Sequence, residues 1–182
     1  MRPLQGVCCT VRAWQKADAD SLVRHADNIN VARHLRDRFP NPYTRQDARA
    51  FLKHATAAND PTNLAIEVAG EAVGAIGYVP GHDVERFSAE IGYWLGETMW
   101  GRGIVTEALQ LLTEHAFARM NVLRMFALPF ADNIGSIRVL EKAGYMREAL
   151  LRSSSVKHGV VKDQVLYARI NLAWTPGPPS AP

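Results

Sequence analysis

The chain has 182 residues, of which 47% are hydrophobic and 21% are charged. This composition is typical of a globular domain and excludes a disordered or fibrous protein. No apolar run approaches the roughly 18 residues that span a bilayer, and the first residues, MRPLQGVCCTVRAW, lack the apolar stretch of a signal peptide. We therefore expect a cytoplasmic protein with one domain over residues 1–174 and a proline-rich, disordered tail over residues 175–182.

The formal net charge of +3 is unevenly distributed along the chain. Residues 1–118 have a charge balance of −2, and residues 119–182 have a balance of +5. The basic C-terminal third fits an anionic ligand such as a polyphosphate cofactor, and it equally fits a solvated face with extra Lys and Arg. Its charge density is below that of a nucleic-acid-binding stripe, so we expect no nucleic-acid partner.

The two cysteines, Cys8 and Cys9, are adjacent in the chain. Adjacent cysteines meet disulfide geometry only with strain, so they do not form a disulfide framework. The sequence has no CxxC or HExxH motif, and its six histidines are scattered. We expect no metal site, and we expect Cys8 and Cys9 to lie in a strand with at least one of them buried.

The first third of the chain predicts a strand followed by short helices. Residues 7–14 are β-prone, and residues 18–26 and 29–35 have helical patterns. The prolines of segment 39–43 predict an irregular backbone. Thr44 and Asp47 resemble a capping box that opens a helix, whose apolar face is formed by Ala48, Phe51, Leu52 and Ala55.

The hydrophobic period then changes from 3.6 to 2, which predicts strands. A hairpin is expected from 63–68 and 72–79, followed by a strand at 87–95. The remaining elements in chain order are a helix from Gly103 to about residue 117, a strand at 122–130, a helix at 133–143, a strand at 145–151, a turn at Gly159 and a strand at 160–170. This order predicts a single mixed α/β sheet.

The segment Trp100-Gly101-Arg102-Gly103-Ile104-Val105 follows a strand and opens a helix. Glycines allow the backbone to approach a ligand closely, and a helix N-terminus presents unpaired N–H groups. These features favour a phosphate-binding loop. The sequence has neither the Walker motif GxxxxGK[ST] nor the dinucleotide fingerprint GxGxxG.

Three motifs together resemble the GNAT superfamily of acetyl-CoA-dependent N-acetyltransferases: residues 89–95 (AEIGYWL), 100–103 (WGRG) and 106–109 (TEAL). The later segment 133–145 (NIGSIRVLEKAGY) is similar to the RimJ/RimL branch, which acetylates N-terminal alanines of ribosomal proteins. The resemblance extends from about residue 10 to residue 170. It implies a mixed, mostly antiparallel sheet of about six or seven strands flanked by helices.

The resemblance also implies which residues bind acetyl-CoA. The pyrophosphate would be held by N–H groups of the loop, and Arg102 would add charge unless it only faces solvent. Tyr93, Trp94 and Leu95 would line the pantetheine channel, or would be core residues. The implied loop residues are Gly101, Arg102, Gly103, Ile104 and Val105. The family loop is usually [QR]xxGx[GA], so Trp100 and Val105 depart from it, and the bulk of Val105 predicts a weaker or shifted CoA pose.

Three polar residues carry the implied chemistry. Asn133 would contact the pantetheine arm and cap its helix. Ser136 would donate a hydrogen bond to the sulfur of departing CoA, or would bond only to its own helix backbone. Glu90 is the candidate general base, working through one water, because attack requires a neutral amine. The alternative for Glu90 is an ion-pair partner at the surface.

The leading hypothesis is direct transfer of an acetyl group from acetyl-CoA to a primary amine, with a protein N-terminus as the acceptor. Polyamines, amino acids and aminoglycosides are alternative acceptors, and a cationic acceptor would require an acidic cleft. A non-catalytic acyl-CoA-binding regulatory domain is the alternative from another class. A homodimer is compatible with the sequence, because homodimers are the commonest soluble assemblies.

Overall fold

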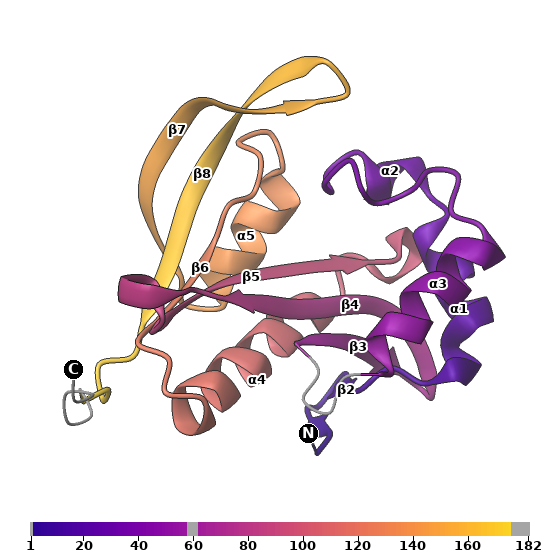
Figure 1. The fold of residues 1–182 in the computed structure, drawn as a ribbon, viewed down its shortest axis with the longest axis horizontal. Coiled ribbons are helices and arrows are strands. Elements are labelled where there is room, and N and C mark those ends of the chain that lie inside the picture. Colours follow the sequence, from indigo (N-terminus) through magenta and orange to yellow (C-terminus); the bar gives the residue numbers. More distant parts are fainter. Residues whose placement is uncertain (1, 58–61, 176–182) are drawn as a thin grey trace.

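The computed structural model describes residues 2–57 and 62–175, arranged around one mixed β-sheet (Figure 1). The strands are β1 (Leu4–Gln5), β2 (Thr10–Arg12), β3 (Asn63–Val68), β4 (Glu71–Pro80), β5 (Ser88–Leu95), β6 (Arg124–Ala127), β7 (Met146–Lys157) and β8 (Val160–Ile170). Their spatial order is β1-β2-β3-β4-β5-β6-β8-β7, and every neighbouring pair is antiparallel except β5 and β6. The single mixed α/β domain is confirmed, with eight strands where about six or seven were expected.

Five α-helices and three short 3₁₀ segments connect the described strands. The helices are α1 (Ala19–Ala26), α2 (Ile29–Ala32), α3 (Arg45–Ala55), α4 (Ile104–Arg119) and α5 (Ile134–Lys142), and the 3₁₀ segments are Lys16–Asp18, Asp83–Glu85 and Glu97–Met99. The predicted capping box at α3 is present, because the Thr44 side chain accepts from the Asp47 N–H and the Asp47 side chain accepts from the Thr44 N–H. None of the described helices is both long and apolar enough to cross a membrane.

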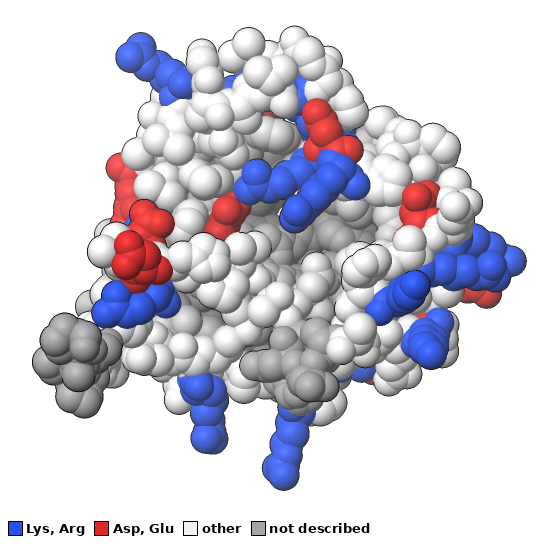
Figure 2. Space-filling model, viewed as in Figure 1, with Lys and Arg blue, Asp and Glu red and all other residues white. Residues whose placement is uncertain are grey.

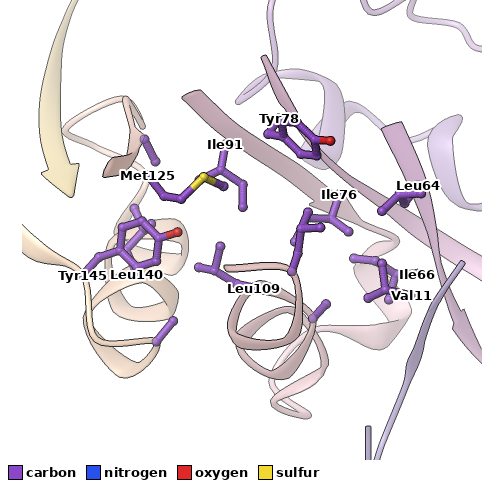
Figure 3. Close-up of a cluster of buried hydrophobic side chains, with 14 of the residues drawn as sticks. Val11, Leu64, Ile66, Ile76, Tyr78, Ile91, Leu109, Met125, Leu140 and Tyr145 are labelled. Atoms are coloured by element: carbon purple, nitrogen blue, oxygen red, sulfur yellow. The ribbon is translucent and has the colours of Figure 1, made fainter. Parts of the chain in front are cut away.

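The two faces of the sheet are covered by different helices. On one face, α4 and α5 pack onto the larger core, which includes Leu64, Ile76 and Leu109 (Figure 3). On the other face, α1 and α3 pack onto a smaller core that includes Ala65 and Ala75. Neighbouring strand residues thus serve opposite cores, because successive side chains of a strand point to opposite faces. This alternation between the two cores explains why the hydrophobic residues of these strands follow a period of 2.

The predicted strand over residues 7–14 is wrong at its first half. The chain bends at Val7 and Cys8, and β2 begins only at Thr10. The reason is a long-range contact: the backbone N–H groups of Val7, Cys8 and Cys9 donate to the Glu107 carboxylate and therefore do not enter a strand ladder. The prediction that at least one cysteine is buried is confirmed, because Cys9 is buried and Cys8 is exposed.

The C-terminal strands form a long hairpin. β7 continues to Lys157 rather than ending near residue 151, and the turn at His158 and Gly159 leads into β8. In Figure 1 this hairpin, coloured orange and yellow, extends beyond α5 toward the side of the molecule where α2 lies. Residues 176–182 of the expected disordered tail lie outside the described residues.

Candidate active site

The loop between β5 and α4 is shaped by two glycines. Gly101 and Gly103 have φ angles of 75° and 77°, values in the left-handed region that favours glycine. The first hydrogen bond of α4 runs from the Glu107 N–H to the Gly103 carbonyl, 3.0 Å away. The N–H groups of residues 101–105 find no acceptor among the described residues, and they lie at the positive end of the α4 dipole. This is the arrangement that binds a phosphate.

Trp100 fixes this loop to the end of β5. Its indole Nε1 donates a hydrogen bond to the Leu95 carbonyl, 2.8 Å away. Arg102 also bonds within the loop, because its guanidinium donates to the Thr98 carbonyl at 2.9 Å while the side chain stays exposed. Val105 is half-buried and packs against the larger core. The two departures from the family loop therefore serve as an anchor and as core packing.

Glu107, in the first turn of α4, joins this loop to the N-terminal segment. Its carboxylate accepts from the backbone N–H groups of Val7, Cys8 and Cys9 at 2.6, 2.9 and 3.0 Å, and from both thiols at 3.0 and 3.3 Å. Partial burial alone would raise the pKa of Glu107, but these donors outweigh burial and lower it to about 2. Burial, together with the carboxylate, raises the pKa of both Cys8 and Cys9.

The cluster of Cys8, Cys9 and Glu107 is also the one place in the described ranges where three potential metal-ligand atoms lie within 4.8 Å of one another. The carboxylate there is already saturated by backbone and thiol donors, as described above. Gly6 next to it has no room for a side chain, because a Cβ would lie 2.4 Å from the Glu107 carboxylate. The cluster thus fits a structural connection between the N-terminal segment and α4.

β5 has an open edge next to this loop. It pairs with β6 through only three residue pairs, Ser88 to Glu90 with Arg124 to Phe126. From Ile91 onward β5 pairs with β4 but with no other described strand, while β6 continues beside β8 (Figure 1). Apart from the Leu95 carbonyl that Trp100 occupies, this edge leaves backbone groups free to bond an extended ligand.

Tyr93 and Ser136 meet at this edge. The Tyr93 hydroxyl and the Ser136 Oγ are 2.8 Å apart, and either oxygen can be the donor. Asn133 places the serine, because its side chain accepts from the Ser136 N–H at 3.1 Å and caps α5. The predicted cap is confirmed. Ser136 Oγ bonds to Tyr93 and not to its own helix, and burial raises the pKa of Tyr93, so the phenol stays protonated.

Glu90 lies on the opposite face of β5 and is paired with Arg36. The Arg36 guanidinium lies 2.6 Å from Glu90 Oε1, and both side chains are partly exposed. The other carboxylate oxygen has no partner among the described residues. Glu90 is therefore an ion-pair partner in this structure, its role as general base stays a prediction, and the carboxylate retains one oxygen for a water or an amine.

The side chains of Trp94 and Leu95 pack toward opposite faces of the sheet. Trp94 packs edge-on against Phe39, with ring centroids 5.7 Å apart, in the smaller core. Leu95 is buried in the larger core. Leu95 is thus a core residue, and Trp94 packs against a core while staying partly exposed. Their backbone lies at the open edge, and their contact with the pantetheine arm stays a prediction.

Two further ion pairs lie beside the site, and both join residues too far apart in the chain for a sequence pattern to indicate them. Lys157, buried at the end of β7, lies 2.8 Å from Asp37, and the lysine hydrogen bond lowers the pKa of Asp37. Lys162 of β8 pairs with Asp132 in the loop before α5. The first pair connects the segment after α2 with β7, and the second connects β8 with the loop before α5. Figure 2 shows Lys and Arg side chains gathered over a hollow near the middle of this face.

The family follows from a direct comparison. A family model described as an acetyltransferase (GNAT) domain matches residues 9–146. The chain belongs to the GNAT family of acetyltransferases. This membership confirms the resemblance drawn from segments 89–95, 100–103 and 133–145, and makes the protein an N-acetyltransferase by class.

Individual relatives agree with this assignment. The chain is 27% identical over 168 residues to the uncharacterized N-acetyltransferase p20 of Bacillus licheniformis, covering 91% of this chain and 94% of that protein. It is 39% identical over 84 residues to the ribosomal-protein-serine acetyltransferase of Escherichia coli, where the match covers 46% of each chain. RimL, a ribosomal α-N-protein acetyltransferase solved in complex with coenzyme A, has the same fold, with a TM-score of 0.81 at 20% identity, covering 93% of this chain and 98% of that one. These relatives support the expected RimJ/RimL-like branch.

Proposed function

We propose that this protein transfers the acetyl group of acetyl-CoA to a protein N-terminal amine by direct attack. One observation carries the proposal: the unpaired N–H groups of residues 101–105 and the open edge of β5 adjoin each other at Trp100 and Leu95. A pyrophosphate followed by an extended amide-containing arm is the ligand that such a pair of features fits. The RimL neighbour, which is a ribosomal α-N-protein acetyltransferase, supports the choice of acceptor.

Glu90 is the proposed proton acceptor. An α-amino group has a pKa near ~8, so a large fraction is protonated at pH 7 and modest help makes it nucleophilic. The free oxygen of the Glu90 carboxylate takes the proton from the amine, directly or through one water. The neutral nitrogen then attacks the thioester carbonyl, and the carbon–nitrogen bond forms.

Ser136 and Tyr93 are the proposed stabilisers of the leaving group. When the tetrahedral intermediate collapses, the carbon–sulfur bond breaks and its electron pair stays on sulfur. A hydroxyl of the Tyr93–Ser136 pair donates to this thiolate, while the second hydroxyl holds the first in position. As the intermediate collapses, its nitrogen gives up a second proton, and this proton ends on the thiolate. The products are the acetylated amine, CoA as its thiol, and one proton on Glu90 that passes to solvent.

The test is a calorimetric titration with acetyl-CoA followed by thiol-release turnover on peptide N-termini, polyamines and aminoglycosides. We expect binding, and turnover confined to peptides. Binding without turnover on any amine would support the regulatory alternative and contradict the proposal. Turnover on polyamines or aminoglycosides alone would retain the chemistry and overturn the acceptor. A loss of acetyl-CoA binding with Gly103→Val, beside retained thermal stability, would assign the binding to the loop.

A further inference from the structure

Carboxylates at the border of the proposed acceptor site have cationic partners. Glu90 is paired with Arg36, Asp37 with Lys157, and Asp132 with Lys162. Two further carboxylates are also bonded: Glu97 accepts from the side chains of Asn28 and Asn30, and Asp163 accepts from the Ser153 N–H. Each of these five carboxylates thus already has a cationic or hydrogen-bonding partner among the described residues, and Glu90 keeps the unbonded oxygen that the proposed reaction uses.

The same region also has basic side chains that take part in none of these ion pairs. Arg33 and Arg38 are exposed and have no carboxylate within ion-pair distance among the described residues. Arg33 lies beside His34, to whose ring nitrogen its Nε donates at 3.3 Å. His34 is in turn close enough to Asp132 and Lys162 to be influenced by both charges. Segment 33–38 therefore adds positive charge beside the Arg36–Glu90 pair, and the charge of Arg33 also acts on Glu97. Figure 2 shows basic side chains, with acidic ones beside them, around the hollow of this face.

Arg36 forms an ion pair with Glu90, the residue that accepts the proton in the proposed reaction. The Arg36 side chain is 64% exposed and the Glu90 side chain 32% exposed, so water screens the pair and it separates at little cost. An incoming carboxylate can form a two-pronged hydrogen-bonded pair with a guanidinium, which is a stronger contact than a single hydrogen bond to one oxygen. An anionic acceptor can thus take Arg36 from Glu90.

We propose that the acceptor is an amine with a carboxylate nearby, supplied by an acidic residue next to a peptide N-terminus, and that this carboxylate binds Arg36 and thereby releases Glu90 to accept the amine proton. The inference rests on the proposed function. It makes Arg36 a specificity residue, since a neutral or basic acceptor leaves the Arg36–Glu90 pair intact. Arg33 adds positive charge to the same border, and segment 33–38 thereby distinguishes acidic from basic N-termini.

The test uses peptides with amidated C-termini that start with Ala and carry Asp-Asp, Asn-Asn or Lys-Lys at the next two positions. For the wild type we expect kcat/KM for the Asp-Asp peptide to be about 10-fold above that for the Asn-Asn peptide, the effect of one charge-assisted hydrogen bond. The Lys-Lys peptide should be poorer still. A second arm compares free alanine with alaninamide, and a preference for free alanine over all peptides would identify an α-carboxylate as the anion and overturn the peptide assignment.

Arg36→Gln should bring the ratio between acidic and neutral peptides close to 1, by raising KM for the acidic peptide, and should raise kcat for the neutral peptide because Glu90 is no longer paired. Arg36→Glu should invert the preference. Arg49→Glu, on the exposed surface of α3, is the matched charge control and should keep the wild-type ratio. Thermal unfolding checks that each variant is folded.

The outcomes separate the two proposals. Equal turnover of all three peptides by the wild type, or an equal loss with Arg36→Gln on all of them, would overturn the role of Arg36 and leave the acetyltransferase assignment in place. Absence of turnover on every peptide, with acetyl-CoA still bound, would contradict the proposed acceptor itself.

Discussion

The indole of Trp100 donates a hydrogen bond to the carbonyl of Leu95, the last residue of β5, across 2.8 Å. This bond links the end of the strand that has the open edge to the loop that presents the free N–H groups. The family loop usually has Gln or Arg at this position. At this departure from the family loop, the side chain anchors the loop to the strand.

Trp100→Phe removes the donor and keeps the aromatic bulk. A single hydrogen bond of this kind contributes about 0.5–1.5 kcal/mol, so we expect KM for acetyl-CoA to rise about 2- to 10-fold with little change in kcat. Steady-state kinetics at saturating acceptor measures both. An unchanged KM would show that the loop holds its shape without the anchor.

Ser136→Ala removes one hydroxyl of the proposed leaving-group pair. We expect kcat to fall by about 10- to 100-fold, somewhat less than the loss of an oxyanion-hole donor, because Tyr93 remains. The dissociation constant of acetyl-CoA should change by less than about 2-fold. Tyr93→Phe should give a smaller loss, and Ser21→Ala, whose hydroxyl bonds to the Asp18 carbonyl in a distant part of the fold, is the control.

Glu90→Gln keeps the shape of the side chain and removes its ability to accept a proton. General-base catalysis contributes about 10²–10⁴-fold, so kcat should fall by at least ~100-fold while acetyl-CoA still binds. Calorimetry and turnover on the same sample make the comparison. If Glu90→Gln retained full turnover, a different group would have to accept the amine proton.

The Glu107 carboxylate makes stability depend on acidic pH. Its pKa is about 2 in the folded protein, below the ordinary value of 4.5, so its contribution is fully present above about pH 4.5. That contribution is lost as the pH falls toward 2, because the carboxylate must then take up a proton. We expect about 1–2 kcal/mol of the free energy of unfolding to be lost in this window, after allowance for its partial exposure.

Thermal unfolding of the wild type and of Glu107→Gln between pH 7 and pH 2.5 measures this contribution. The variant should be less stable at pH 7, and the difference between the two proteins should shrink toward pH 2.5. A constant difference across the range would show that the carboxylate charge is not what holds Val7 and Cys9.

Arg12 is expected to contribute to stability through its buried ion pairs. It is 8% exposed, donates to both oxygens of the buried Asp18 at 2.8 and 2.9 Å, and pairs with Glu67. Arg12→Ala leaves a buried carboxylate without its cation, which costs about 3–5 kcal/mol. Chemical denaturation measures the loss. Arg45→Ala, which breaks an exposed pair with Asp20, should cost less than about 1 kcal/mol.

The elements that local pattern determines were predictable from the sequence. The capping box at Thr44, the hairpin that begins at residue 63 and the helix after Gly103 are set by near neighbours in the chain, and each is confirmed. The resemblance to the GNAT family in the segments 89–95 and 133–145 added the mixed, mostly antiparallel character of the sheet and the candidate phosphate-binding loop.

The contacts between distant segments were not predictable. Val7 looks like a strand residue until Glu107, 100 positions later, binds its N–H. Arg36 and Asp37 look like ordinary surface charges in a polar stretch, and only the fold brings them to Glu90 and Lys157. Ion pairs between residues so far apart in the chain produce no periodic pattern, so they cannot be predicted from the sequence.

The short parallel pairing of β5 and β6 has a mechanical consequence. Five strands on one side of it and three on the other are each joined by antiparallel ladders, and only three residue pairs connect the two sets directly. Few hydrogen bonds therefore cross this seam, and a ligand bonded along the β5 edge stiffens it without changing either set. When the ligand binds, amide hydrogen exchange at Ile91 to Trp94 would slow more than exchange in the middle of β4. The exchange rates of the sheet would therefore report whether the ligand is bound.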